Sequence, residues 1–225
     1  MYIEDLLLLI PIAITLIAQI YVNSSYSKYK KVGNTKGISG FEVARQILDN
    51  NGLSDVYVTE TKGMLSDHYD PSRKVVRLST DIFHGTSIAS TSVAAHEVGH
   101  AIQDKVGYAF MKFRAALFPF VNISSYAGYI SILIGVLFSS LELIWIGIAL
   151  EVVILLFQLI TLPVEFDASR RAKQEIKKEG FLTKAELEGS NAMLKAAAYT
   201  YVAAVIANIM QILRLVLMYG GNRRD

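Results

Sequence analysis

Residues 95–101 read AHEVGHA and contain the pattern His-Glu-x-x-His at His96, Glu97 and His100. Two histidines four residues apart lie on one face of a helix, so both imidazoles can bind one metal ion. The neighbouring glutamate can then accept a proton from a metal-bound water, because zinc lowers the pKa of that water towards 7. Apolar residues flank the motif on both sides, as in a buried helix. The spacing therefore predicts a helix that binds one zinc ion (Zn2+), with Glu97 as general base.

The alternative is a surface helix that carries this pattern by chance. Two of only four histidines fall at the required spacing with a glutamate between them, which favours the metal site. The chain has no cysteine, so a disulfide, a thiolate ligand and a cysteine nucleophile are all excluded. Any metal must therefore be held by histidine or carboxylate side chains. The four histidines are His68, His84, His96 and His100.

Long apolar runs account for much of the 52% hydrophobic content of this 225-residue chain. Each is long enough to cross a bilayer. The first run starts with Glu4 and Asp5 and lacks a cleavage site, so we expect an uncleaved anchor rather than a signal peptide. We expect Pro11 to kink that helix or mark its early boundary, and Pro163 to end the third span. The runs lie at about residues 3–22, 118–138, 143–163 and 196–218.

The order of apolar and polar segments predicts the organisation of the chain. The second and third spans form a hairpin, so the polar segments before and after it lie on the same side of the membrane and can build one site. The net charge of +2 gives no strong field for nucleic acid, and we expect no such partner. The predicted segments are an anchor (1–22), a catalytic domain (23–112), the hairpin (113–163), a segment with the third ligand (164–195), a fourth span (196–218) and a tail (219–225).

Basic residues indicate the side of the membrane, because cytoplasmic flanks are enriched in lysine and arginine. The hairpin loop has no basic residue, whereas eight flank the spans on the side of the predicted site. Arg223 and Arg224 at the C-terminus disagree with this assignment. We therefore expect a multi-pass protein of the cell membrane whose site faces the cytoplasm. The eight residues are Lys28, Lys30, Lys31, Lys112, Arg114, Arg170, Arg171 and Lys173.

The segment 23–112 has the pattern of a small α+β domain. Ser39 and Glu42 fit a capping box at the start of an amphipathic helix that ends near Asn50. Residues 56–59 and 74–79 predict two short strands, and residues 87–105 predict the helix of the zinc motif. We therefore expect an α+β zincin-like catalytic domain combined with four transmembrane helices.

A catalytic zinc site needs a third protein ligand. One zincin class uses a histidine six residues after the second motif histidine, but Val106 stands at that position. The ligand should instead be a carboxylate from later in the chain, which makes the site gluzincin-like. Candidates are Glu142, Glu151, Glu165, Asp167, Glu175 and Glu179.

Position in the chain separates these candidates. Glu142 falls on the wrong side of the membrane and Glu151 lies deep in the third span. Glu165 comes just after Pro163, at the membrane edge on the side of the zinc helix, and we choose it. Asp167 is the second choice, and both acids could instead be ordinary residues at a helix N-terminus. The small Ala168 shares the face of Glu165 and would let a helix pack close to the metal.

Three further stretches accompany the zinc motif, namely SDHYDP (66–71), VRLS (76–79) and PVEFDAS (163–169). With them, essentially the whole chain resembles the YugP-type membrane zinc metallopeptidases, a group of neutral zinc metallopeptidases. The layout is also similar to that of the HtpX-type membrane metalloproteases, which carry Glu-x-x-Ala-Asp after the hairpin. The resemblance implies peptidase activity, with Glu165 as a zinc ligand and Ala168 as the small residue.

One position departs from the HtpX-type pattern. Ser169 stands where that pattern has an aspartate. That aspartate would contact a ligand histidine on the side of the ring away from the metal. Asp167 or Asp104 could take over that role.

His68 precedes the second predicted strand. Zincins pair an extended substrate with a strand near the zinc helix, and residues 74–79 are our candidate for that strand. His68 or Tyr69 could then stabilise the oxyanion of the transition state. Equally, His68 could be a loop residue with only a local hydrogen bond. We expect His84 to be a solvated loop residue.

The leading hypothesis is a membrane-integrated endopeptidase that hydrolyses membrane-associated or membrane-adjacent proteins. Its partners would be a protein or peptide substrate and the lipid bilayer, while the sequence gives no oligomeric state. The first alternative is an intramembrane protease, but the motif is flanked by polar residues. The second alternative is a membrane scaffold that binds zinc without catalysis, which would not need Glu97.

Overall fold

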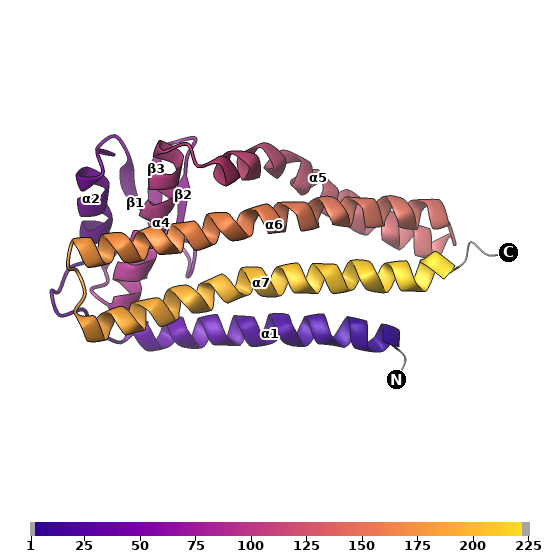
Figure 1. The fold of residues 1–225 in the computed structure, drawn as a ribbon, viewed down its shortest axis with the longest axis horizontal. Coiled ribbons are helices and arrows are strands. Elements are labelled where there is room, and N and C mark those ends of the chain that lie inside the picture. Colours follow the sequence, from indigo (N-terminus) through magenta and orange to yellow (C-terminus); the bar gives the residue numbers. More distant parts are fainter. Residues whose placement is uncertain (1–2, 222–225) are drawn as a thin grey trace. The chain divides into compact units, whose positions relative to one another are not determined.

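The computed structural model describes residues 3–221, with side chains from residue 7 onward, so Arg223 and Arg224 lie outside the described part. Figure 1 shows the elements in chain order. They are α1 (Ile3–Lys30), α2 (Gly40–Asn50), β1 (Tyr57–Thr61), β2 (His68–Asp70), β3 (Val75–Ser79), α3 (Thr80–His84), α4 (Ile88–Lys105), α5 (Ala109–Leu137), α6 (Leu141–Lys178) and α7 (Lys184–Gly220).

The described residues form two compact units. We call residues 3–19, 112–162 and 199–221 the apolar unit, and residues 20–111 and 163–198 the polar unit. Helices α1, α5, α6 and α7 each contribute residues to both units. All residues of the predicted metal site belong to the polar unit.

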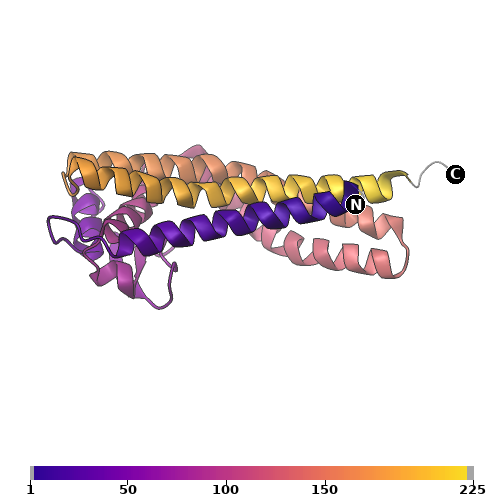
Figure 2. The ribbon, with the colours of Figure 1, turned by 90° about the horizontal axis from the view of Figure 1, so that it is seen from below.

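Four helices within the described residues, α1, α5, α6 and α7, are long and apolar enough to cross a membrane, as the four apolar runs predict. Helices α5 and α6 form the expected hairpin in the apolar unit and lie side by side (Figure 2). Glycines allow this close packing: a Cβ atom on Gly135 would lie 2.9 Å from the backbone nitrogen of Ile144. Small residues at such contacts are typical of helices that pack within membranes.

The two prolines do not end helices. Pro11 lies inside α1, and Pro163 lies inside α6, which continues to Lys178. Helix α6 therefore continues past Pro163, while the end of the membrane span at this residue stays a prediction; the boundary between the two units falls between Leu162 and Pro163. A proline inside a helix removes one backbone hydrogen bond, but the residues after Pro163 gain a buried stripe that keeps the chain helical. The fully buried stripe consists of Val164, Ala168, Ala172 and Ile176.

The polar unit contains a three-stranded sheet in the order β1-β3-β2. Strand β3 pairs with β1 in parallel and with β2 in antiparallel orientation. Val76 and Leu78 of β3 are fully buried, and they join Ile47 and Leu48 of α2 and Val98 of α4 in one core. Burying each such side chain contributes roughly 1.5–3 kcal/mol. The core fixes α4, which carries the zinc motif, against the sheet and α2.

Most local predictions for this unit are confirmed. The capping box at Ser39 and Glu42 is present at the start of α2, and α4 covers the predicted zinc helix. The predicted strands correspond to β1 and β3, whereas the three-residue β2 was not predicted because it is too short to show a pattern. The short helix α3 was also missed, and His84 is its last residue rather than a loop residue.

The sheet order corrects one functional prediction. Residues 74–79 were expected to pair with substrate, but β3 is the central strand and both of its edges are already paired. A central strand has no free backbone groups to offer. Any substrate strand must therefore add to the outer edge of β1 or β2.

Candidate metal centre

Helix α4 presents two histidines on one face. Its N-cap is Ser87, whose hydroxyl accepts a hydrogen bond from the backbone N–H of Ser90 (3.1 Å). His96 and His100 follow along the helix with ring centroids 4.9 Å apart and ring planes nearly perpendicular. The side chain of His96 is 16% exposed and that of His100 is 10% exposed, so both are accessible to a small ion but not to bulk solvent.

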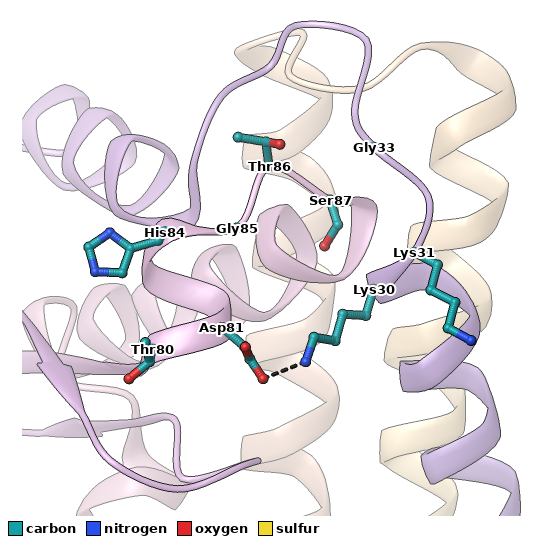
Figure 3. Close-up of a pocket in the computed structure, with 9 residues that line it drawn as sticks. All are labelled: Lys30, Lys31, Gly33, Thr80, Asp81, His84, Gly85, Thr86 and Ser87. Atoms are coloured by element: carbon teal, nitrogen blue, oxygen red, sulfur yellow. Dashed lines mark hydrogen bonds and ion pairs between the residues drawn. The ribbon is translucent and has the colours of Figure 1, made fainter.

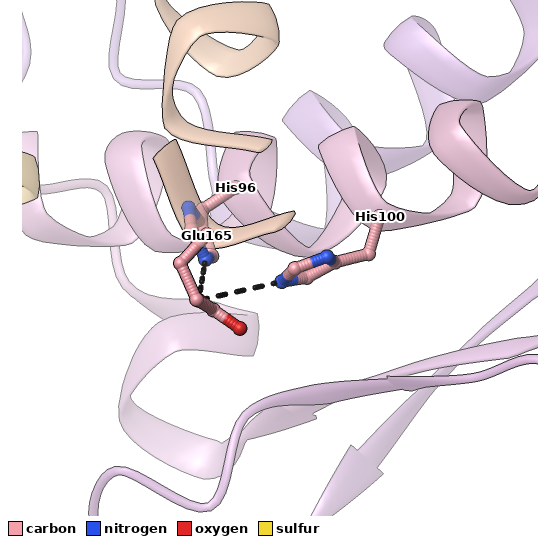
Figure 4. Close-up of side chains that lie close together, drawn as sticks. All are labelled: His96, His100 and Glu165. Atoms are coloured by element: carbon pink, nitrogen blue, oxygen red, sulfur yellow. Dashed lines mark ion pairs between the residues drawn. The ribbon is translucent and has the colours of Figure 1, made fainter. Parts of the chain in front are cut away.

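Glu165 of α6 completes a cluster with these histidines (Figure 4). Its Oε2 atom lies 3.3 Å from Nε2 of His96 and 3.7 Å from Nε2 of His100. One ligand atom from each residue lies within 4.8 Å of the other two. The carboxylate is almost fully buried, and 65 residues or more separate it in sequence from both histidines.

The distances from Glu165 to the two histidines fit zinc. Zinc binds imidazole nitrogen and carboxylate oxygen at about 2.0–2.2 Å, so neighbouring ligands in a tetrahedron lie about 3.3–3.6 Å apart. The two contacts of Glu165 are close to that range. A set of two imidazoles and one carboxylate also leaves one tetrahedral position open, as catalytic zinc sites require.

The charge of Glu165 acts on His100. Burial opposes protonation of this imidazole, yet the hydrogen bond and charge of Glu165, together with the charge of Glu97 and the hydrogen bond to Gln103, outweigh burial and raise the pKa of His100. The carboxylate therefore creates a negative potential at the position where the ligand atoms converge, which suits a cation.

A glycine lets α6 approach the zinc helix. A Cβ atom on Gly99, between the two histidines, would lie 2.6 Å from the backbone oxygen of Ala168. Ala168 is itself fully buried, one turn after Glu165. A larger residue at Gly99 would push the α6 backbone away from the histidines. The expected close packing at Ala168 is thus present, and it depends equally on Gly99.

The second nitrogen of each histidine also has a partner. Nδ1 of His96 lies 3.2 Å from the hydroxyl of Ser169, and Nδ1 of His100 lies 3.0 Å from Oε1 of Gln103. Such contacts orient metal-binding histidines. The serine that departs from the HtpX-type pattern therefore contacts a histidine directly.

Glu97 is buried beside the cluster and is 8% exposed. Burial raises the pKa of its carboxyl group, and the charges of Glu165 and Asp67 act in the same direction, while the two histidines oppose them. Within residues 3–221, no hydrogen bond ties up this carboxylate. It is therefore able to exchange a proton with a bound water.

The other candidate ligands have other partners. Asp167 accepts hydrogen bonds from Arg170, Arg171 and Gln103, and it is not part of the cluster. Glu175 and Glu179 accept from side chains of α2 and its C-cap. Glu142 and Glu151 belong to the apolar unit.

The residues considered for the oxyanion also have defined positions. His68 is exposed on β2, and its Nδ1 lies 2.8 Å from the backbone oxygen of Ser66. Tyr69 donates its hydroxyl hydrogen to Asp104 (3.0 Å), and burial is the main cause that raises the pKa of this phenol. Asp104 therefore contacts Tyr69 and, within residues 3–221, no histidine of the cluster.

Three residues of the site were missed or underrated from sequence, namely Gly99, Gln103 and Ser169. Gly99 lies inside the motif, where any residue fits the pattern. Gln103 lies one turn after His100, and an amide at that spacing is the signal in the sequence that could have identified it. Its full burial in the structure means that the amide needs hydrogen-bond partners there. The contact of Ser169 depends on how α6 packs, so spacing alone could not show it.

A pocket of about 550 Å³ lies elsewhere in the polar unit, between the end of α1 and α3 (Figure 3). Lys30 and Asp81 form an ion pair in its wall, and Ser87 lies at its edge. None of the three cluster residues lines it. This pocket is therefore not the metal centre.

Fold and site together define a membrane protein with a buried group of two histidines and one glutamate suited to zinc. The family model described as "Putative neutral zinc metallopeptidase" matches residues 5–220, and the chain belongs to this family. The chain is also 49% identical over 208 residues to "Putative membrane protease YugP" of Bacillus subtilis (strain 168). This alignment covers 92% of each of the two chains. The comparison with solved structures found no match.

Proposed function

We propose that this chain is a membrane-integrated, zinc-dependent endopeptidase. His96, His100 and Glu165 bind one zinc ion, and Glu97 is the general base. The observation that carries this proposal is the convergence of three ligand atoms within 4.8 Å from two helices that are distant in sequence. Membership in a zinc peptidase family supports the same chemistry.

When bound, zinc supplies a Lewis acid that lowers the pKa of a coordinated water and polarises the scissile carbonyl. Glu97 accepts the proton of the attacking water and then donates it to the leaving amine. Its burial favours the first step of this shuttle, because a raised pKa makes the carboxylate a stronger base towards the attacking water. Glu165 and the two histidines fix the position of the reaction without exchanging protons.

A peptide substrate would add as a strand to the outer edge of β2. This short strand pairs with β3 on one side, and the described residues place no strand on its other side. Tyr69 links β2 to Asp104 at the C-terminal end of the zinc helix, which keeps this edge next to α4. Backbone pairing of this kind holds an extended peptide without regard to most of its side chains.

His68 on β2 is the candidate that stabilises the oxyanion. It is exposed, and its Nδ1 contacts the backbone of Ser66, which leaves Nε2 to face a substrate. Tyr69 is less suited, because its hydroxyl hydrogen is already donated to Asp104. Replacing His68 with alanine should lower kcat and leave zinc content unchanged.

The zinc helix favours a site beside the membrane over an intramembrane protease. Helix α4 is not among the four helices that are long and apolar enough to span a bilayer, in the part of the chain that the structure describes. The many basic residues that flank the spans favour the cytoplasmic side of the cell membrane. Substrates would then be membrane proteins or proteins close to the membrane surface.

The decisive experiment compares wild type with Glu97→Gln in purified, zinc-loaded protein. The variant should keep its zinc and lose peptide cleavage by roughly 10²–10⁴-fold, because only the base is removed. Unchanged cleavage would overturn the mechanism. A wild-type protein that binds zinc but cuts no peptide under any condition would favour the scaffold.

A second experiment identifies the third ligand. Glu165→Ala should lower the zinc content of purified protein, whereas Asp167→Ala should retain more zinc. If Glu165→Ala keeps one zinc ion per chain, another residue is the ligand. Proteomics of cells with wild type against cells with Glu97→Gln would then identify the substrates.

A further inference from the structure

We infer that Gln103 and Asp167 form a relay that fixes the tautomer of His100 and so presents its Nε2 lone pair to the metal. This inference rests on the proposed zinc site and assigns a positioning role to two residues that bind no metal themselves. The first of them, Gln103, is fully buried.

The amide of Gln103 has three polar neighbours. Its Nε2 donates to the backbone oxygen of Val164 (2.7 Å) and to Oδ2 of Asp167 (3.1 Å). Its Oε1 lies 3.0 Å from Nδ1 of His100. The two hydrogens of the amide are thus used by two groups on α6, and the oxygen faces the histidine.

This amide cannot be reversed. A carbonyl oxygen and a carboxylate only accept hydrogen bonds, so the group that faces them must be the NH₂ of the amide. Rotation by half a turn would place Oε1 against both acceptors at 2.7 and 3.1 Å. Asp167 is itself held in place by Arg170 and Arg171, which makes it a fixed acceptor.

The fixed orientation of the Gln103 amide determines which nitrogen of His100 carries the hydrogen. Because Oε1 of Gln103 only accepts, Nδ1 of His100 must carry a hydrogen to use the contact. In a neutral imidazole the other nitrogen, Nε2, then holds the lone pair, and this atom is the one that faces Glu165. His96 differs, because the hydroxyl of Ser169 can donate or accept and dictates no tautomer.

The relay also explains the role of Asp167, which the sequence suggested as an alternative ligand. Two arginines and Gln103 surround its carboxylate, and it acts two hydrogen bonds away from the metal. Asp167 therefore works through Gln103 rather than by direct binding.

The test measures zinc affinity by competition with a chelator, using the full chain in detergent. Gln103→Leu should bind zinc roughly 10–100-fold more weakly than wild type, which is the usual effect of losing such a partner. Asn51→Leu is the matched control. The amide of Asn51 also donates to a backbone oxygen, of Ile47 (2.9 Å), and to a carboxylate on α6, of Glu175 (3.0 Å), but touches no histidine.

A rescue experiment exchanges the amide of residue 103 and the carboxylate of residue 167 and measures whether zinc affinity returns. Gln103→Glu alone should weaken zinc binding, because the carboxylate of the new Glu and that of Asp167 would then face each other, and neither can donate a hydrogen bond. The double variant Gln103→Glu, Asp167→Asn restores one donor and one acceptor, and should recover part of the affinity. This arm keeps the inference testable if Gln103→Leu does not fold.

Nuclear magnetic resonance of protein with ¹⁵N-labelled histidine reads the tautomer directly, since the chain has only four histidines. We expect a hydrogen on Nδ1 of His100 that exchanges slowly with water in wild type and in Asn51→Leu, and faster in Gln103→Leu. A His100 ring without a hydrogen on Nδ1 would overturn the relay alone, as would equal zinc affinity of Gln103→Leu and wild type. Failure of wild type to bind zinc would instead overturn the proposed function.

Discussion

Helix α6 packs against a different helix in each unit. In the apolar unit its residues 141–162 lie against α5, where glycines such as Gly135 let aliphatic side chains and backbone come close. In the polar unit its residues 163–178 lie against α4 through Gly99 and through the hydrogen bonds of Gln103. Both contacts use a glycine for close approach, and the second adds the directional hydrogen bonds of Gln103.

This difference indicates what each contact controls. Packing of small and aliphatic groups sets how near two helices come, and it tolerates small shifts at modest cost. A metal site needs ligand atoms placed within a few tenths of an ångström, which directional contacts supply. Substitutions at the two glycines should therefore have different consequences for zinc.

The largest effect is expected for Gly99→Ala. The new Cβ atom would lie 2.6 Å from the backbone oxygen of Ala168, so α4 and α6 must move apart. We expect a loss of about 1–3 kcal/mol in the free energy of unfolding, which exceeds the gain of about 1 kcal/mol from better helix propensity. Zinc affinity should fall at least tenfold, measured by chelator competition.

The matched control for Gly99→Ala is Gly33→Ala. The nearest atom to a Cβ at Gly33 is 3.9 Å away, so this substitution should change neither stability nor zinc affinity. Wild-type zinc affinity in Gly99→Ala would show that the close approach of α6 does not set the ligand spacing.

The second effect is expected for Gly135→Ala in the hairpin. Its Cβ atom would meet the backbone nitrogen of Ile144 at 2.9 Å and the backbone oxygen of Ser140 at 3.0 Å. We expect a lower Tm but unchanged zinc affinity. Gly220→Ala, whose Cβ would find only a side-chain atom at 3.7 Å, is the control. A loss of zinc in Gly135→Ala would contradict the separation of the two contacts.

The sequence predicted the parts of the site that depend on local spacing. His96, Glu97 and His100 follow from the helical repeat, and the structure places both histidines in the cluster. Position beside the third span favoured Glu165, and the structure brings it to the same cluster. Family membership, which the resemblance implied, is confirmed by the match over residues 5–220.

Other features depend on contacts between distant segments. The order of the strands could not be read from sequence, because β2 has only three residues and decides which strand is central. The continuation of α6 past Pro163 could not be read from the proline alone, because it depends on the buried stripe that follows. The partners of the histidines, Gln103 and Ser169, depend on the packing of α4 against α6.

A smaller effect is expected for Ser169→Ala, which removes the hydroxyl next to Nδ1 of His96 (3.2 Å). Zinc affinity should fall by about tenfold, at the lower end of such effects, because His96 is more exposed than His100 and water can replace the hydroxyl. Ser169→Thr keeps the hydroxyl and should restore most of the affinity. Wild-type zinc affinity in Ser169→Ala would show that the hydroxyl does not support His96.

The smallest effect is expected for Ser39→Ala at the start of α2. Its hydroxyl accepts from the backbone N–H of Glu42 (3.3 Å), while its own backbone N–H donates to the Glu42 carboxylate (2.8 Å). Alanine removes the first of these bonds and also the bond that the hydroxyl donates to the Glu42 carboxylate (2.6 Å), while the backbone bond remains, so the free energy of unfolding should fall by about 1 kcal/mol. Zinc affinity should not change, because α2 supplies no residue of the cluster. A fall in affinity comparable to that of Gly99→Ala would show that any loss of stability in the polar unit loosens the site, and that the contact of α4 with α6 has no special role.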